Sequence, residues 1–256
     1  MMFGILGQLL VNDGTDHRSI PAPKQRIILA ALILNANRIT SVEDLAALVW
    51  EDSRPGSWQA ALHNYIARLR RAMGGAGQRL VTHSPGYVLE LAPETESDLG
   101  IFASLSHRAR AAVETRSWQE AGALLRSALE MWRGTPLVDV PCEALHREWV
   151  PALTEHRLKL LEWRIESDLW LRQETYLVAE LRPLIAAHPL RERFSCQLMI
   201  ALSRSGRQAE ALAVYQDVRH KLVAELGIEP GPELQSTHRR VLAGEPTHES
   251  AGDHAS

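Results

Sequence analysis

Basic and amide side chains gather on one side of residues 58–73. If this segment is a helix, with roughly 100° between successive residues, that side carries Asn64, Ala67, Arg68 and Arg71, flanked by His63 and Arg70. Arginine, asparagine and histidine side chains reach base edges or phosphates in the major groove of DNA, and a small alanine lets a helix lie close to them. The pattern therefore indicates a DNA-reading helix, with a merely solvated arginine-rich helix as the alternative.

The other side of the same segment is apolar. Leu62, Ile66, Leu69 and Met73 follow the i, i+4, i+7, i+11 spacing of one buried stripe. Such a stripe must pack against the rest of its own domain. The segment is thus expected to be an amphipathic helix, docked on one side and open to a ligand on the other.

A β-hairpin is expected directly after this helix. Two short β-prone runs within residues 79–91 flank Ser84, Pro85 and Gly86, and proline followed by glycine suits the central positions of a type II turn. Helix and hairpin together form a winged helix. Arg70, Thr82 and Ser84 are candidate contacts to the DNA phosphate backbone. Tyr87 either contacts DNA from the wing or packs in the core of the sheet, and we favour the core. An ordinary hairpin closing a small domain is the alternative.

The residues before the basic helix predict the rest of a helix-turn-helix unit. Short strands are expected over residues 2–20, followed by a helix over 24–34 and a second helix from about Ser41 to Trp50. Ser41 and Asp44 have the spacing of a capping box. Lys24 and Arg26 lie in the first turn of the first helix, beside free backbone N–H groups that suit a phosphate. The alternative is that both side chains are simply hydrated at the start of the helix and bind no phosphate.

Composition and size fit a two-domain protein. The chain has 256 residues and a net charge of −3. A slight basic excess before residue 92 gives way to an acidic remainder, so any DNA contact must be local. No long apolar run predicts a membrane span, and the two cysteines predict neither a disulfide framework nor a zinc site. We expect no metal, no cofactor and no enzyme activity, because no phosphate loop or catalytic motif occurs.

Helical periodicity dominates from Leu99 to Leu242. Leu177, Leu181 and Leu184 have the same spacing as Ala211, Tyr215 and Val218, and the two sets are one tetratricopeptide period of about 34 residues apart. The predicted fold class is mainly α with a small β part, an N-terminal winged helix-turn-helix followed by an all-α, tetratricopeptide-like repeat domain. The expected ranges are 1–92, a short linker at 93–98, 99–244, and a disordered tail at 245–256. A generic helical bundle is the alternative for the second domain.

Several motifs resemble those of a known family. Residues 23–34, 64–71 and 84–87 resemble the OmpR-type DNA-binding domain of the SARP family, the Streptomyces antibiotic regulatory proteins. Residues 188–193, 205–212 and 225–234 resemble the bacterial transcriptional activation domain of the same family. The resemblance covers about residues 2 to 244, with departures at Ala22 and in the glycine-rich stretch 74–77. Because the sequence has no phosphate-loop motif, the chain resembles the small members of the family rather than the larger members that carry an ATPase module.

The resemblance implies a function and partners. It implies a cytoplasmic, nucleoid-associated activator of an antibiotic or other secondary-metabolite gene cluster. Family members bind tandem direct repeats of double-stranded DNA near the promoter −35 element and recruit RNA polymerase holoenzyme, including sigma region 4. Direct repeats imply a head-to-tail homodimer. We expect two surfaces to contact the polymerase: the loop after the second helix, through Glu51, Asp52, Ser53 and Arg54, and the acidic helical domain.

Two other functions remain open from the sequence. The protein could be a ligand-responsive repressor or sensor that uses the concave face of its helical repeats as a binding groove. It could also be an interaction scaffold in which the arginine-bearing helix is only solvated. A reporter-gene assay would distinguish a repressor from an activator. Salt-dependent binding to duplex DNA would exclude the interaction scaffold.

Overall fold

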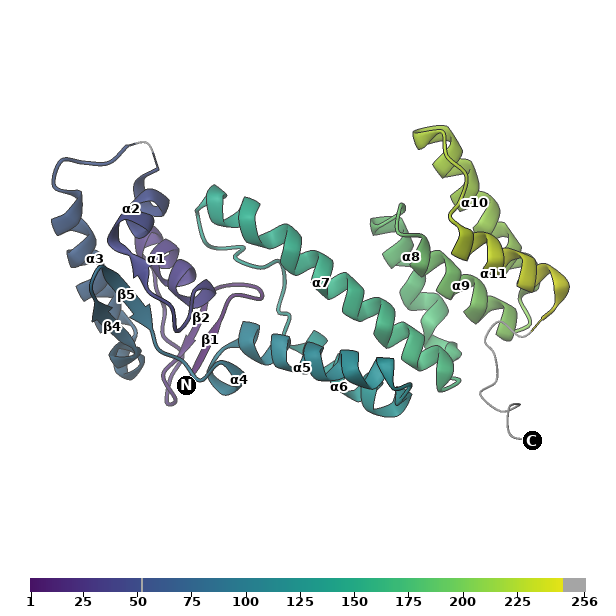
Figure 1. The fold of residues 1–256 in the computed structure, drawn as a ribbon, viewed down its shortest axis with the longest axis horizontal. Coiled ribbons are helices and arrows are strands. Elements are labelled where there is room, and N and C mark those ends of the chain that lie inside the picture. The colour runs from purple at the N-terminus through teal and green to yellow at the C-terminus, as the bar shows by residue number, and fades with distance from the viewer. Residues whose placement is uncertain (52, 246–256) are drawn as a thin grey trace. The chain divides into compact units, whose positions relative to one another are not determined.

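The computed structural model describes residues 1–51 and 53–245, and Figure 1 labels most of their helices and strands. Two compact units are present: Met1–Arg110 with Leu124–Leu160, and Ala111–Ala123 with the residues from Leu161 on. None of the described helices is both long and apolar enough to span a bilayer. Of the disordered tail expected at 245–256, all but Glu245 lies outside the described residues, and the predicted domain ranges stay predictions.

Two small antiparallel sheets frame the N-terminal part of the first unit. Strands β1 (Met2–Gly4) and β2 (Leu10–Asn12) form one sheet, in which Phe3 pairs with Val11. Strands β3 (Thr40–Ser41), β4 (Leu80–His83) and β5 (Gly86–Leu89) form the other sheet, in the order β3-β5-β4. The predicted strands before Ile20 and the hairpin after residue 79 are both confirmed.

Three helices lie between these strands. They are α1 (Pro23–Leu34), α2 (Val42–Trp50) and α3 (Trp58–Ala72), and the short 3-10 helix η1 (Gly74–Arg79) leads into the hairpin. Pro23 opens α1 at its first turn, where a missing N–H costs nothing. Ser41 caps α2 by accepting a hydrogen bond from the Asp44 N–H, at 3.0 Å. The capping role expected of Ser41 is confirmed.

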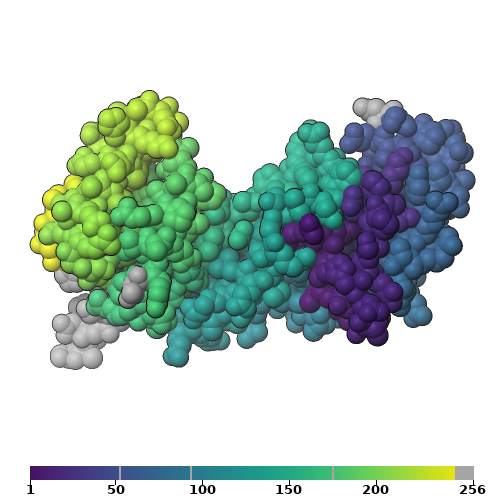
Figure 2. Space-filling model, turned by 180° about the vertical axis from the view of Figure 1, so that it is seen from behind, coloured from purple at the N-terminus to yellow at the C-terminus, as the bar shows by residue number. Residues whose placement is uncertain are grey.

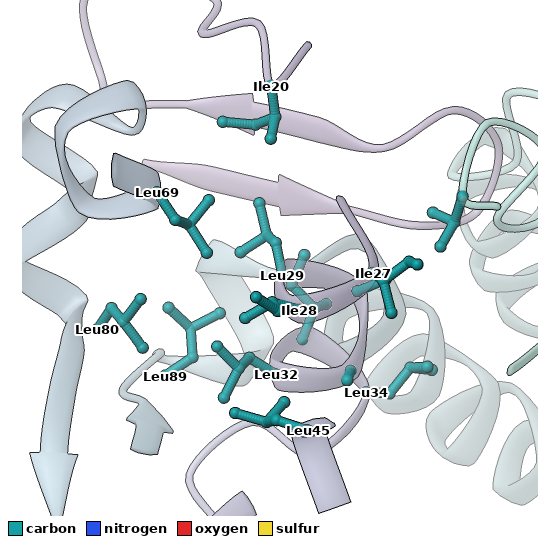
Figure 3. Packing of buried hydrophobic residues seen from close by; sticks show 14 of the residues in the cluster. Ile20, Ile27, Ile28, Leu29, Leu32, Leu34, Leu45, Leu69, Leu80 and Leu89 are labelled. Carbon is teal, nitrogen blue, oxygen red and sulfur yellow. The ribbon is translucent and has the colours of Figure 1, made fainter. Parts of the chain in front are cut away.

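Helix α1 is the centre of the hydrophobic core of this unit. Its residues from Ile27 to Leu34 are all buried, as expected for a helix that is apolar on every side. In Figure 3, Ile28, Leu29 and Leu32 of α1 lie among buried side chains from α2, α3 and the hairpin, namely Leu45, Leu69, Leu80 and Leu89. This packing fixes the position of α3 and the hairpin relative to each other.

The residues after the hairpin are helical. The helices are α4 (Pro93–Glu96), α5 (Asp98–Glu114), α6 (Trp118–Glu130), α7 (Glu143–Trp170), η2 (Glu174–Tyr176), α8 (Leu177–Ala187), α9 (Glu192–Arg204), α10 (Gln208–Leu226) and α11 (Pro232–Ala243). In the second unit α9 packs against α8, α10 and α11. Leu177, Leu181, Ala211, Tyr215 and Val218 are buried, while Leu184 is half-buried. The repeat-like helical fold is confirmed.

The first unit extends well beyond the hairpin. The Asp98 carboxylate, at the start of α5, accepts hydrogen bonds from the N–H groups of Ile5 and Leu6 at 2.9 to 3.0 Å. It also pairs with Arg133, whose Nη2 lies 2.6 Å from Oδ2. Figure 2 shows the purple N-terminal residues lying directly against teal residues of this later segment. The N-terminal strands and the helices that follow the hairpin are therefore held together by bonds across long stretches of sequence.

Candidate nucleic-acid interface

Helix α3 has the two faces that the sequence predicts. Leu62 and Leu69 are 0% exposed, Ile66 is 1% exposed, and Met73 directly after the helix is 0% exposed. The side chains on the opposite side are all exposed: Gln59, Ala60, His63, Asn64, Ala67, Arg68 and Arg71. We call these seven residues the outer face of α3. The burial of one stripe and the exposure of the other confirm the amphipathic helix.

Two members of the outer face were missed by the sequence reasoning. Gln59 precedes His63 by one helical turn, and Ala60 precedes Asn64 by one turn. Glutamine can bond the N6 and N7 edge of adenine, and alanine fits against a thymine methyl group. The i, i+4 spacing alone would have found both residues.

Arg70 lies on the flank of α3 and joins the helix to the hairpin. Its Nε donates to the Leu80 carbonyl oxygen and its Nη2 donates to Thr82 Oγ1, both at 2.8 Å. Its guanidinium also lies over the Tyr87 ring, 5.8 Å from the centroid. The structure thus gives Arg70 and Thr82 a positioning role, since these bonds hold strand β4 against α3. Whether either residue also contacts phosphate stays a prediction.

Tyr87 belongs to the core rather than to the surface of the hairpin. It is 5% exposed, and burial raises the pKa of its hydroxyl above the ordinary value. Its ring meets the ring of His63 edge to face, with centroids 6.4 Å apart. Of the two roles considered for Tyr87, this geometry favours the core.

The hairpin turn differs from the expected type II turn. His83 pairs with Gly86, so the loop consists of Ser84 and Pro85, and the peptide bond between them is cis. Pro85 therefore occupies the third turn position, whereas type II would place it second. Position 86 requires glycine because a Cβ there would collide with the Thr40 carbonyl oxygen of the paired strand β3. Thr82, His83 and Ser84 are exposed at the tip.

The two basic residues at the start of α1 are less open than the outer face of α3. Lys24 is half-buried, and its ammonium lies 4.9 Å from the Trp50 ring centroid and 5.8 Å from that of Tyr65. Arg26 is also half-buried, and its Nε is buried without a hydrogen-bond partner among the described residues. The cation–π contacts of Lys24 stabilise the junction of α1, α2 and α3. Phosphate binding by Lys24 and Arg26 stays a prediction.

The loop between α2 and α3 is exposed and tied to both helices. Arg54 Nη1 lies 2.8 Å from Glu43 Oε2, and the guanidinium lies over the Trp58 ring at 5.2 Å. The Ser53 hydroxyl donates to the Trp50 carbonyl oxygen at 3.0 Å. Glu51 is exposed, and Asp52 lies outside the described residues. Polymerase contact by this loop stays a prediction.

Helix α3, the hairpin and the helices that support them form the arrangement of a winged helix (Figure 1). The outer face of α3 presents two arginines, an asparagine, a glutamine and a histidine, and the hairpin tip lies beside it through the bonds of Arg70. An α-helix fits the major groove of B-form DNA, and these side chains have the donors and acceptors that base edges require.

Comparisons with known proteins agree with this arrangement. Residues 97–242 match the family described as bacterial transcriptional activator domain, and residues 19–89 match the family described as transcriptional regulatory protein, C terminal. The chain is 39% identical over 246 residues to the regulatory protein AfsR of Streptomyces coelicolor, a match that covers 96% of this chain and 24% of AfsR. It is 36% identical to the regulatory protein DnrI of Streptomyces peucetius, covering 96% of this chain and 93% of DnrI.

A solved structure is also similar. It is that of Mycobacterium tuberculosis EmbR in complex with a low affinity phosphopeptide, with a TM-score of 0.89 and 34% identity over 96% of this chain and 65% of that chain. The chain spans about a quarter of AfsR, just under two thirds of EmbR and nearly all of DnrI. From its winged helix, its activator-domain match and its similarity to DnrI over nearly the full length of both proteins, the chain belongs to the SARP family of DNA-binding transcriptional regulators.

Proposed function

We propose that the chain activates transcription by placing α3 in the major groove of promoter DNA. Asn64, Arg68 and Arg71 read base edges or adjacent phosphates, with His63 and Gln59 beside them. The observation that carries this proposal is the exposure of the whole outer face of α3 while the opposite stripe is buried. The exposed hairpin tip, from Thr82 to Ser84, contacts the neighbouring backbone. Phosphate contacts then position the helix, and base contacts give specificity.

Mobility-shift titration tests this assignment. Footprinting on promoters around the gene would first define the operator. We expect Arg68→Ala and Arg71→Ala each to cost about 1–3 kcal/mol, which is roughly 5- to 150-fold in Kd. Arg38→Ala is the matched control, because Arg38 is exposed but lies outside α3 and the hairpin. Unchanged operator affinity in both α3 variants would refute the assignment.

Two protomers bind head to tail on tandem direct repeats, about one helical turn apart near the −35 element. Membership of the SARP family supports this, because direct repeats place two protomers in the same orientation rather than about a two-fold axis. Shifting the spacing of the repeats by half a helical turn should abolish cooperative binding while leaving binding to one repeat unchanged. Equal affinity at both spacings would contradict the head-to-tail dimer.

The protein recruits RNA polymerase holoenzyme, including sigma region 4, to a secondary-metabolite gene cluster in the cytoplasm. The exposure of Glu51, Ser53 and Arg54 next to α3 supports a polymerase contact in this loop. In transcription with purified components, Glu51→Lys should lower activation without changing operator affinity. Full activation by this variant would remove Glu51 from the contact, and loss of DNA binding would assign it to the DNA interface instead.

A further inference from the structure

A groove lies within the first compact unit, between the DNA-binding helices and the start of α7. It has a volume of about 370 Å³ and is lined by the end of α1, strand β3, helix α2 and the first turns of α7. Figure 1 shows the beginning of α7 beside α1 and α2, and Trp149 packs against the same hydrophobic core as these helices. The groove shares no residue with the outer face of α3.

Two carboxylates stand in the walls of this groove. Asp44 comes from α2 and Glu148 from α7, and both side chains are exposed. One oxygen of Asp44 accepts a hydrogen bond from the Ser41 hydroxyl at 2.6 Å. Among the described residues, neither carboxylate has a basic side chain within 4.0 Å, whereas the exposed acids Glu43, Glu210 and Glu229 are each paired with an arginine. The groove therefore offers negative charge that the protein itself does not neutralise.

Apolar side chains lie beside the carboxylates. Leu145 is 3% exposed, Leu48 and Trp149 are half-buried, and Ile39 keeps 51% of its surface exposed. An indole next to carboxylates favours a cation, since the face of the ring attracts positive charge. The aliphatic side chains add a surface for an apolar group. The carboxylates, the indole ring and the aliphatic side chains all favour a ligand that combines a positive charge with an apolar group.

We propose that this groove binds a small organic cation, with a protonated amine or guanidinium group between Asp44 and Glu148 and an apolar body against Trp149, Leu48 and Ile39. The volume lies within the range of about 300–1,000 Å³ that is typical of small-molecule sites. A bound cation links α2, which packs against α3, to α7 of the activation part. The site is independent of the DNA interface proposed above, so either proposal can fail without the other.

Calorimetric titration of the full chain with three probes tests the charge preference. The probes are phenethylamine, 2-phenylethanol and phenylacetate. They share a phenyl group with a two-carbon side chain, and at pH 7 they are cationic, neutral and anionic, respectively. We expect phenethylamine to bind at least about 10-fold more tightly than phenylacetate, because each carboxylate attracts one and repels the other. Similar affinities for all three probes would overturn the proposal.

Substitution of the two acids tests the location. The double variant Asp44→Asn, Glu148→Gln keeps the shape of both side chains and should weaken phenethylamine binding about 3- to 10-fold, since each exposed charge contributes modestly. Glu143→Gln is the control, because Glu143 is an exposed acid on the same helix outside the groove. Equal weakening in the control and in the double variant would place the effect in general surface charge and overturn the site.

Three further probes decide between a small ligand and a basic protein segment. Agmatine and spermidine extend the set of cations, and a hexa-arginine peptide represents a protein partner. Binding of any of the three small cations with a Kd below about 10 mM, weakened at least about 3-fold in the double variant, supports the proposal. Binding of the peptide alone, or of none of the probes, overturns it.

Discussion

Replacing Asp98 by asparagine should destabilise the first compact unit by about 2–4 kcal/mol. The side chain of Asp98 is 5% exposed, and it accepts bonds from Ile5 N–H, Leu6 N–H and Arg133. Asparagine keeps the shape, but one of its two terminal atoms becomes an NH₂ group that must face at least one donor. A hydrogen bond to a charged group contributes about 1.5–3 kcal/mol. The Arg133 side chain is 35% exposed, so the ion pair adds no more than about 1 kcal/mol.

Urea unfolding and hydrogen exchange measure this effect. The midpoint for the first unit should fall in Asp98→Asn, and the peptide covering residues 2–12 should exchange faster. Asp139→Asn is a graded control, because Asp139 accepts a single backbone bond, from Leu9 N–H at 2.8 Å. A double-mutant cycle with Arg133→Gln should give a coupling of at least about 0.5 kcal/mol. A loss below about 0.5 kcal/mol in Asp98→Asn, with an additive cycle, would refute the reasoning.

Three other perturbations have defined outcomes. Gly86→Ala should lower the free energy of unfolding by about 1–3 kcal/mol and the melting temperature with it, because the added Cβ would collide with the Thr40 carbonyl oxygen. An unchanged melting curve would contradict the close approach of β3 and β5. Ser41→Ala should cost about 1 kcal/mol of stability by removing the cap of α2, as measured by urea unfolding, whereas Ser41→Asp should retain most of it. Burial raises the pKa of the Cys196 thiol to about 11, so its reactive thiolate stays scarce until the pH approaches that value. At pH 8, iodoacetamide should therefore modify Cys196 roughly 100-fold more slowly in the folded protein than in urea. Equal rates of modification would contradict this.

The sequence predicts those parts of the interface that depend on local periodicity. The buried stripe from Leu62 to Met73 and the exposed stripe that contains Asn64 and Arg68 follow from helical spacing alone, because neighbours on one face are three or four residues apart. The bounds predicted for the three helices before the hairpin agree with the structure to within a few residues for the same reason. Gln59 was missed although its spacing was visible.

Features that depend on distant residues could not be predicted in this way. Arg70 has the same residue type as its neighbours Arg68 and Arg71, and only the position of the hairpin turns it toward Leu80 and Thr82. The pairing of Asp98 with Ile5 and Arg133 joins residues 93 and 35 positions apart, and no local pattern marks it. The turn type was wrong because Ser84, Pro85 and Gly86 fit two registers, and the pairing of His83 with Gly86 decides between them.

The extent of the first compact unit limits how regulators of this family can exchange their DNA specificity. Leu137, Val140, Cys142 and Leu145 complete the hydrophobic core that surrounds α1, although they follow the hairpin by some fifty residues. A recombination event that transplants only the first 92 residues would pair the core of one parent with the closing side chains of another, and Ile5 and Leu6 would depend on the other parent for the carboxylate that accepts their N–H groups. Productive chimaeras should therefore carry the segment from Leu124 to Leu160 along with the winged helix, so that inheritance of a new operator brings part of the activation helices with it.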